Sequence, residues 1–174
     1  YSEHNTEIII KNNYKIKSKE IFYDRLNNKL YSEKETEIVD NENNIYKLKN
    51  NFEFDLTSDK LLSKKAEIID SDNNKYFFEN LFIDLKNNKI AGKELKIEFV
   101  DSFFGNKNND PVLRGRSAYS NDNELKIYKA VFSTCNTLNK KCRGWELNSK
   151  EFNHDKQKKI FEYKDSWLKI FDFK

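Results

Sequence analysis

The two cysteines, Cys135 and Cys142, are the residues whose type and spacing most plainly admit chemistry. They are the only cysteines of the chain, and six residues separate them in STCNTLNKKCRGW. A zinc site needs about four closely spaced ligands, and no second cysteine pair or nearby histidine supplies them. A local disulfide is geometrically possible, and so is pairing with cysteines outside this sequence. Spacing alone leaves both alternatives open.

Three regularly recurring aspartates are the next candidates. Asp24, Asp55 and Asp84 open the similar stretches DRLNNKL, DLTSDKL and DLKNNKI. Repeated acids in β-solenoids can be catalytic or can bind calcium. Each aspartate here precedes a polar turn by a few residues, however, which favours an Asx-type cap of that turn.

No constellation for catalysis accompanies these residues. The histidines, His4 and His154, lie in polar surroundings, and the sequence has no GxSxG, HExxH or Gly-rich phosphate-binding motif. We therefore expect a protein that is not an enzyme and that has neither a metal site nor a cofactor.

The composition indicates a folded β protein with a thin core. Among the 174 residues, 35% are charged, 37% hydrophobic and 14% aromatic. The net charge is only +3, and no basic run carries interleaved aromatic residues, so we expect no nucleic-acid partner.

Turn signals divide the chain into short segments that are too brief for helices. Asn/Asp clusters recur from Asn12-Asn13 to Asn87-Asn88, with runs of about ten residues between them. The three aspartate stretches start 31 and 29 residues apart (55 − 24 and 84 − 55), and DKQKKI at 155–160 is a shorter fourth copy. A two-stranded repeat of about thirty residues must stack on its neighbours to bury its apolar face.

Apolar and charged residues alternate within these segments, as in an antiparallel sheet that is wet on one face. The apolar face is either the core of a folded-over sheet or a trough for an acyl chain. We refer to ten positions on it as the predicted trough: Tyr14, Ile16, Phe52, Phe54, Phe78, Ile83, Leu95, Ile97, Leu125 and Ile127.

We expect one domain over residues 1–174, with 133–174 as an exit segment. FFGNKNNDPV at 103–112 interrupts the alternation, which resumes by Leu125, and is expected to be a loop. No apolar run approaches the roughly 20 residues of a membrane-spanning helix, and no signal peptide is visible. The chain begins at Tyr1 without a Met, so we expect a processed or trimmed fragment.

The exit segment resembles part of a known family. AVFSTC at 130–135, Cys142, Trp145-Glu146-Leu147 and HDKQKKIFEYKDSWLKIF at 154–171 resemble the N-terminal periplasmic region of the LptD family of lipopolysaccharide-assembly proteins. That family shows an aromatic-x-T-C segment, a second cysteine in many members, and a basic strand that leads into an outer-membrane barrel. The upstream repeats are similar to the OstA-type repeats of LptA, LptC and LptD.

The resemblance implies an OstA/LptA-like β-jellyroll, a folded-over antiparallel sheet whose interior conducts the acyl chains of lipid A. It implies an outer-membrane location on the periplasmic side, in a Gram-negative bacterium. The implied partners are lipopolysaccharide, an LptA-like bridge protein paired at an edge strand, the protein's own C-terminal barrel, and an LptE-like lipoprotein.

Family cysteines form disulfides between this domain and the barrel. Cys135 matches the family position, whereas Cys142 follows a longer spacer than is common there.

Two other functions are compatible with the same residues. One is a periplasmic bridge of the LptA or LptC type, or another structural β-repeat module without a barrel. The other is a β-helical carbohydrate-active enzyme that uses the repeated aspartates, which would require their carboxylates to cluster on one exposed face.

Overall fold

The computed structural model of the chain describes residues 2–10, 14–100, 111–134 and 144–170. These residues form twelve β-strands and no helix, which confirms the predicted all-β class. Within this part of the chain, no helix is long and apolar enough to cross a membrane. The strands are β1 (Ser2–Ile10), β2 (Tyr14–Asp24), β3 (Lys29–Ser32), β4 (Thr36–Asp40), β5 (Ile45–Asp55), β6 (Lys60–Ile69), β7 (Lys75–Asp84), β8 (Lys89–Glu98), β9 (Val112–Ser120), β10 (Glu124–Ser133), β11 (Trp145–Asp155) and β12 (Ile160–Ile170).

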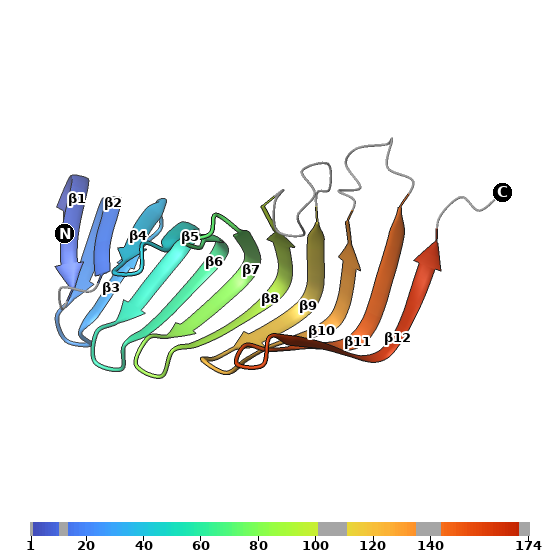
Figure 1. Cartoon of the computed structure of the whole chain (residues 1–174). Coiled ribbons are helices and arrows are strands. Elements are labelled where there is room, and N and C mark those ends of the chain that lie inside the picture. Colours follow the sequence, from blue (N-terminus) through green and yellow to red (C-terminus); the bar gives the residue numbers. More distant parts are fainter. Residues whose placement is uncertain (1, 11–13, 101–110, 135–143, 171–174) are drawn as a thin grey trace.

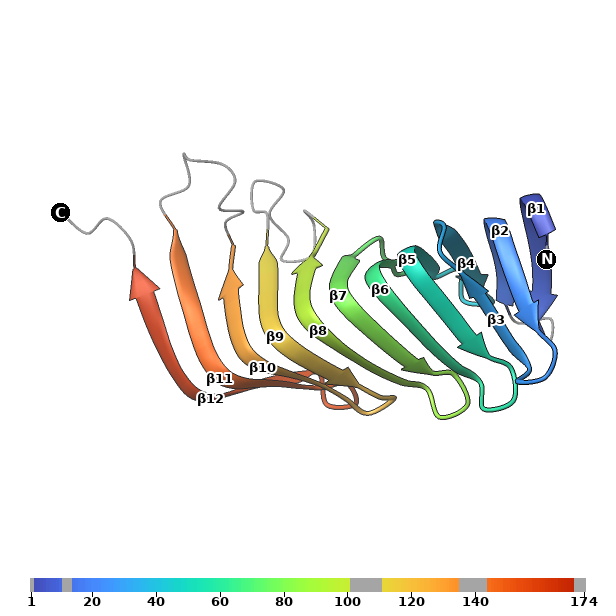
Figure 2. The same ribbon diagram turned by 180° about the vertical axis from the view of Figure 1, so that it is seen from behind.

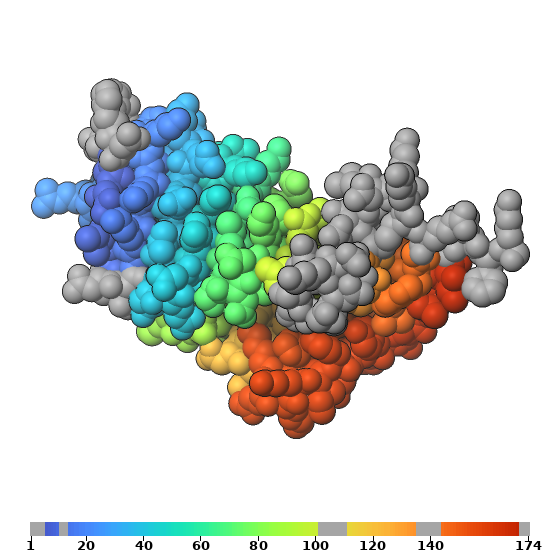
Figure 3. Space-filling view, turned by 45° about the horizontal axis from the view of Figure 1, so that its top comes forward, coloured from blue at the N-terminus to red at the C-terminus, as the bar shows by residue number. Residues whose placement is uncertain are grey.

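All twelve strands belong to one antiparallel sheet in which chain neighbours are also spatial neighbours (Figures 1 and 2). The short strands β3 and β4 both pair with β2 on one side and with β5 on the other. Together they therefore occupy the place of one long strand, and the sheet is an eleven-position meander. In the space-filling view, the colours change in the same order, from blue near β1 to red near β12 (Figure 3).

The long strands bend near their middle, which divides the sheet into two walls (Figure 1). Non-glycine residues adopt a positive φ within five strands, at Asn51, Lys65, Glu94, Lys129 and Asp165. Such residues add local twist and bend, as β-bulges do. Wall A consists of the strand halves next to the turns at 24–29, 55–60, 84–89, 120–124 and 155–160. Wall B consists of the opposite strand halves, which include those next to the turns at 40–45 and 69–75.

Polar turns at the edges of both walls hydrogen-bond to one another. On wall A, the N–H of Leu56 donates to the carbonyl of Asn28 (3.0 Å), and the N–H of Leu85 donates to that of Asp59 (2.9 Å). On wall B, Oδ1 of Asn44 accepts from the N–H of Ser71 at 3.2 Å. The predicted stacking of thirty-residue units therefore has a physical basis in turn-to-turn bonds as well as in strand pairing.

The core lies between the two walls. It is one continuous cluster of buried side chains that extends from Ile10 in β1 to Phe152 in β11. The last two strands continue the same sheet, so the described part of the exit segment is a structural extension of the repeats.

Candidate functional site

All ten predicted trough residues lie in or against the core. Ile16, Phe54 and Ile97 are at most 1% exposed, whereas Tyr14 and Leu125 are half-buried at its edge. The remaining buried members are Phe52, Phe78, Ile83, Leu95 and Ile127. Strand alternation thus placed these side chains on the inner face, but burial alone does not assign them a lipid.

Cross-strand pairing arranges the inner face into two mainly apolar rows, one on each wall. The wall B row is Ile8, Ile16, Ile38, Tyr46, Ile68, Tyr76, Ile97, Leu113, Phe132, Leu147 and Leu168. The wall A row is Leu30, Phe54, Leu61, Ile83, Ile90, Ser120, Leu125, His154 and Phe161. The wall B row extends from β1 to β12 and the wall A row from β3 to β12, so the inner face forms a mainly apolar path along most of the described sheet.

This path is closed near β2 and wider near β8. A cavity of about 10 Å³ separates the walls where Ile16, Phe54 and Ile83 meet. A second cavity of about 170 Å³ is lined by Phe78, Ile97 and further residues of both walls. An apolar cavity of about 150 Å³ is sufficient for a benzene-sized group. The larger cavity therefore accommodates a short hydrocarbon segment, and we refer to it as the central cavity.

The central cavity lies below a polar rim on wall B that the sequence analysis did not identify. At turn 70–76, Oδ1 of Asp70 accepts from the N–H of Asn74 (2.8 Å), and its Oδ2 accepts from the hydroxyl of Tyr76 (2.9 Å). Asp40, Asn44 and Tyr46 repeat this arrangement thirty residues earlier. Recurrence of Asp-x-x-x-Asn-x-Tyr at that interval was the available signal.

The two rim tyrosines are held in their neutral form. Burial, followed by the adjacent carboxylate of Asp70, raises the pKa of Tyr76 well above its ordinary value. Burial and Asp40 do the same to the pKa of Tyr46. The rim therefore presents neutral hydroxyls that donate to the two carboxylates, and it holds the phenol rings over the apolar interior.

Two glycines allow the inner face to pack. A Cβ added at Gly92 would collide with the ring of Phe78 and lie 3.1 Å from the carbonyl oxygen of Asn80. A Cβ at Gly115 would collide with the side chain of Ile127. Both glycines thus make room for predicted trough residues, and neither was singled out by alternation of apolar and charged residues.

Aromatic side chains gather at the β12 end of wall A. The ring centroid of Phe161 lies 4.5 Å from that of His154 and 5.5 Å from that of Phe152, whose ring is also 5.3 Å from Tyr163. Burial, followed by the charge of Lys156, lowers the pKa of His154 below its ordinary value. This histidine is therefore a neutral member of an aromatic cluster at physiological pH.

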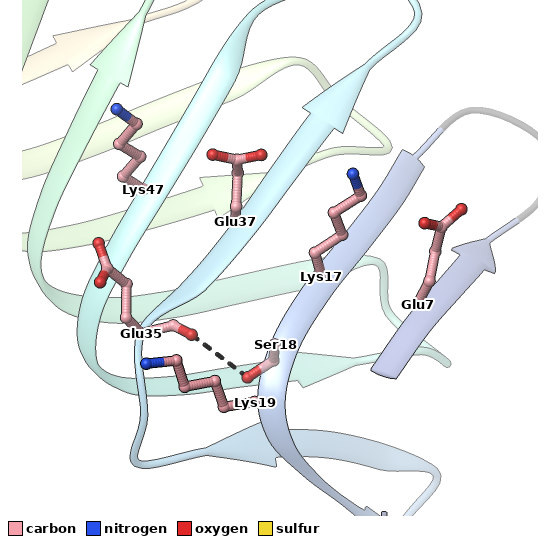
Figure 4. A pocket seen from close by; sticks show the side chains of 7 residues that line it. All are labelled: Glu7, Lys17, Ser18, Lys19, Glu35, Glu37 and Lys47. Carbon is pink, nitrogen blue, oxygen red and sulfur yellow. Dashed lines mark hydrogen bonds between the residues drawn. The ribbon is translucent and has the colours of Figure 1, made fainter. Parts of the chain in front are cut away.

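A further hollow among the described residues lies on the outer face and is charged. It measures about 650 Å³ and is lined by Glu7, Lys17, Ser18, Lys19, Glu35, Glu37 and Lys47 (Figure 4). Cross-strand neighbours there alternate in sign, since Lys17 lies opposite Glu7 and Glu37, and Glu37 lies opposite Lys47. Alternating pairs of this kind stabilise the strand register, and we assign the hollow that structural role.

The turn-cap interpretation of the repeated aspartates is confirmed. Oδ1 of Asp24 accepts from the N–H of Leu26 at 3.0 Å and Asn27 at 3.1 Å. Asp55 and Asp84 accept equivalent bonds from the turns that follow them. Hydrogen bonds lower the pKa of each carboxyl. The side-chain amides of Asn27 and Asn87 contribute most for Asp24 and Asp84, and the N–H of Ser58 contributes most for Asp55.

Several residues singled out in the sequence lie outside the described ranges. Cys135 and Cys142 both lie outside, so their pairing stays a prediction. The Asn12-Asn13 turn and most of loop 103–112 also lie outside. In the described ranges, no group of three or more His, Cys, Asp or Glu residues could hold a metal ion.

Comparison with known proteins does not assign the chain to a family. No family model matches it, and no curated protein sequence matches it significantly. The site must therefore be interpreted from its own geometry and from the resemblance carried by its motifs.

Proposed function

We propose that this chain is a lipid-conducting periplasmic domain of an LptD-like protein. It receives lipopolysaccharide and passes the acyl chains of lipid A along its interior towards an outer-membrane barrel. The activity is transport without covalent chemistry, and it requires no cofactor.

The observation that carries this proposal is the central cavity, which lies between two mainly apolar rows that both reach β12. A core of stacked repeats is continuous as well, but a closely packed core leaves few empty spaces of this size between its walls. The central cavity between the rows is lined by Ile68, Ile90, Leu95 and Ala118 among others, so its surface is mainly hydrocarbon.

The energetics of apolar contact suit passage better than tight capture. Each buried CH₂ group contributes about 0.8 kcal/mol, and the contact has no preferred direction. An acyl chain can therefore slide from one set of side chains to the next. Since the central cavity holds only a short segment, residues such as Phe78 must move aside as a longer chain advances.

The free edge of β1 supports the expected bridge partner. β2 is the one neighbour of β1 in the described part of the sheet, and Ile9 is 63% exposed. An edge strand of this kind recruits an additional strand by β-augmentation. We place the LptA-like bridge protein at this edge, and the barrel with its LptE-like lipoprotein beyond the exit segment.

A bridge module of the LptA or LptC type is the second candidate. The two open edges of the sheet, at β1 and β12, favour it, because a bridge must pair at both ends. The two candidates share the interior and differ in whether a barrel follows Lys174, which the sequence of the complete gene decides.

Acyl dependence of binding tests the proposal directly. A fluorescent fatty-acid probe is bound to the purified chain and then competed with lipopolysaccharide or with the same glycolipid after complete deacylation. We expect only the acylated form to displace the probe. Equal displacement by the deacylated sugar, or absence of probe binding, would contradict an apolar conduit.

A further inference from the structure

The last strand, β12, has an unusual surface for the edge of a sheet. It is eleven residues long and, among the described strands, pairs only with β11. Every one of its residues is exposed, including Trp167 at 56% and Leu168 at 57%. Further exposed apolar members are Ile160, Phe161, Tyr163 and Ile170. Proteins normally protect a long apolar edge because its unpaired N–H and C=O groups accept another strand.

The topology of the sheet restricts which strand can pair there. In an eleven-position antiparallel meander, the first and last strands run in the same direction, so β1 and β12 are parallel. Head-to-tail stacking of copies with a continuous interior would then join β12 to β1 in a parallel pair, unlike every other pair in the sheet. If instead a two-fold axis at the bend of β12 relates two copies of the chain, their β12 strands pair with each other in an antiparallel arrangement.

The sequence of β12 is complementary to itself in one such register. The bend at Asp165 must face the bend of the other copy if both walls are to continue across the junction. Pairing each residue i with residue 331 − i satisfies this condition. It places Phe161 opposite Ile170 and Tyr163 opposite Leu168 on the inner face.

The same register pairs complementary groups on the outer face. Glu162 lies opposite Lys169 of the second copy, and by symmetry the pair occurs twice. Lys164 lies opposite the indole of Trp167, a geometry suited to a cation–π contact. Shifting the register by two, to i with 329 − i, sets Tyr163 opposite Ser166 and Glu162 opposite Trp167. That alternative keeps one apolar pair, Phe161 opposite Leu168, and sets Lys164 opposite Asp165, but it loses the second apolar pair and the Glu162–Lys169 pair.

We propose that two copies of this chain pair tail to tail through β12, in the register that places Glu162 opposite Lys169, to form one continuous sheet with a shared interior. Eleven residues on each side are about half of the 20–30 found in stable interfaces, and we expect a weak dimer that micromolar concentrations can populate. This proposal concerns self-association and does not rest on the lipid-conducting function, which would instead turn the β12 edge towards a barrel.

Charge exchange across the two-fold axis tests the proposal. Sedimentation velocity over the micromolar range measures the dissociation constant under reducing conditions, so that Cys135 and Cys142 cannot link copies. Glu162→Lys places lysines opposite each other twice, and we expect it to weaken the dimer about ten-fold or more. The double variant Glu162→Lys/Lys169→Glu restores opposite charges and should return the constant towards that of the unmodified chain.

A matched control and a local reporter sharpen the experiment. Glu79→Lys makes the same charge change at an exposed position of β7, away from the edge, and should leave the dimer unchanged. In a Trp145→Phe variant, Trp167 is the only tryptophan, and its emission should shift to shorter wavelength as concentration rises.

Each other outcome overturns the proposal. A monomer at all concentrations removes the interface, and a series of species larger than a dimer indicates head-to-tail stacking through β1. A dimer that ignores Glu162→Lys, or that the double variant fails to restore, excludes this register. Circular dichroism of each variant establishes that loss of the dimer is not loss of the fold.

Discussion

Ala118→Leu should make the protein more stable and a poorer lipid binder. Ala118 lies in β9, is 8% exposed, and lines the central cavity of about 170 Å³. Leucine adds three carbon atoms that enter space now empty of side chains. At about 0.8 kcal/mol for each buried carbon group, less some strain, the free energy of unfolding rises by about 1–2 kcal/mol.

The same three carbons occupy room that an acyl chain would use. Loss of about 2 kcal/mol of apolar contact corresponds to roughly 30-fold weaker binding of the fatty-acid probe. Thermal unfolding and probe titration on one preparation measure both effects. A gain of about 3–6 °C in the unfolding midpoint is expected for a domain of this size.

Ala130→Leu is the matched control. Ala130 is 3% exposed in β10 but does not line the central cavity. The added carbons have no space there, so we expect a loss of about 1–3 kcal/mol of stability through overpacking. If Ala118→Leu is destabilising as well, the cavity is not available space. If it stabilises the protein but leaves probe binding unchanged, the cavity is not where acyl chains lie.

Three further predictions concern the elements around this cavity. Asp55→Asn should make the stability of the protein less dependent on acid. Folding lowers the pKa of Asp55, so the unfolded state binds the proton more tightly and the stability of the unmodified chain falls as the pH drops below about 4. Unfolding measured from pH 7 to pH 2 tests this. A slope equal to that of the unmodified chain would remove Asp55 as a titrating cap. Tyr76→Phe deletes the 2.9 Å bond to Asp70 and should cost about 1–2 kcal/mol in denaturant unfolding, and no loss would mean that water replaces the hydroxyl without penalty. Gly92→Ala should cost about 1–3 kcal/mol because its Cβ meets the ring of Phe78, and adding Phe78→Leu should recover part of that loss; if the pair of changes is simply additive, the ring is not the obstacle.

The parts of the fold that depend on local pattern could be predicted from sequence. Alternation placed Ile16, Phe54 and Ile97 on the buried face, since successive side chains of a strand point to opposite faces. The thirty-residue repeat located the turns capped by Asp24 and Asp55, because an Asx bond acts within a few residues of chain.

The bends of the strands were not predictable in the same way. Lys65, Glu94 and Lys129 adopt a positive φ, although long side chains disfavour it and glycine is the usual signal. The tertiary packing of two walls imposes these conformations, and no local motif announces them. Widening of the interior towards β8 likewise depends on cross-strand neighbours that come from different repeats.

Exposure of β12 was also hidden from the sequence. Its alternation of Phe161, Tyr163 and charged residues resembles that of the buried strands, and only its position at the edge of the sheet leaves it uncovered. Sequence predicts which residues prefer burial, whereas the topology decides which of them obtain it.

Photocrosslinking from adjacent positions of one strand tests the lipid-conduit proposal most directly. Ile97 and Lys96 are neighbours in β8, but Ile97 lines the central cavity and Lys96 lies on the outer face beside the ring of Phe77. A photoreactive residue is placed at each position in turn and irradiated with lipopolysaccharide present. The conduit predicts capture from Ile97 and little from Lys96, with the same contrast between Phe54 and Lys47. Equal capture from both faces, or capture from the outer face alone, would contradict it.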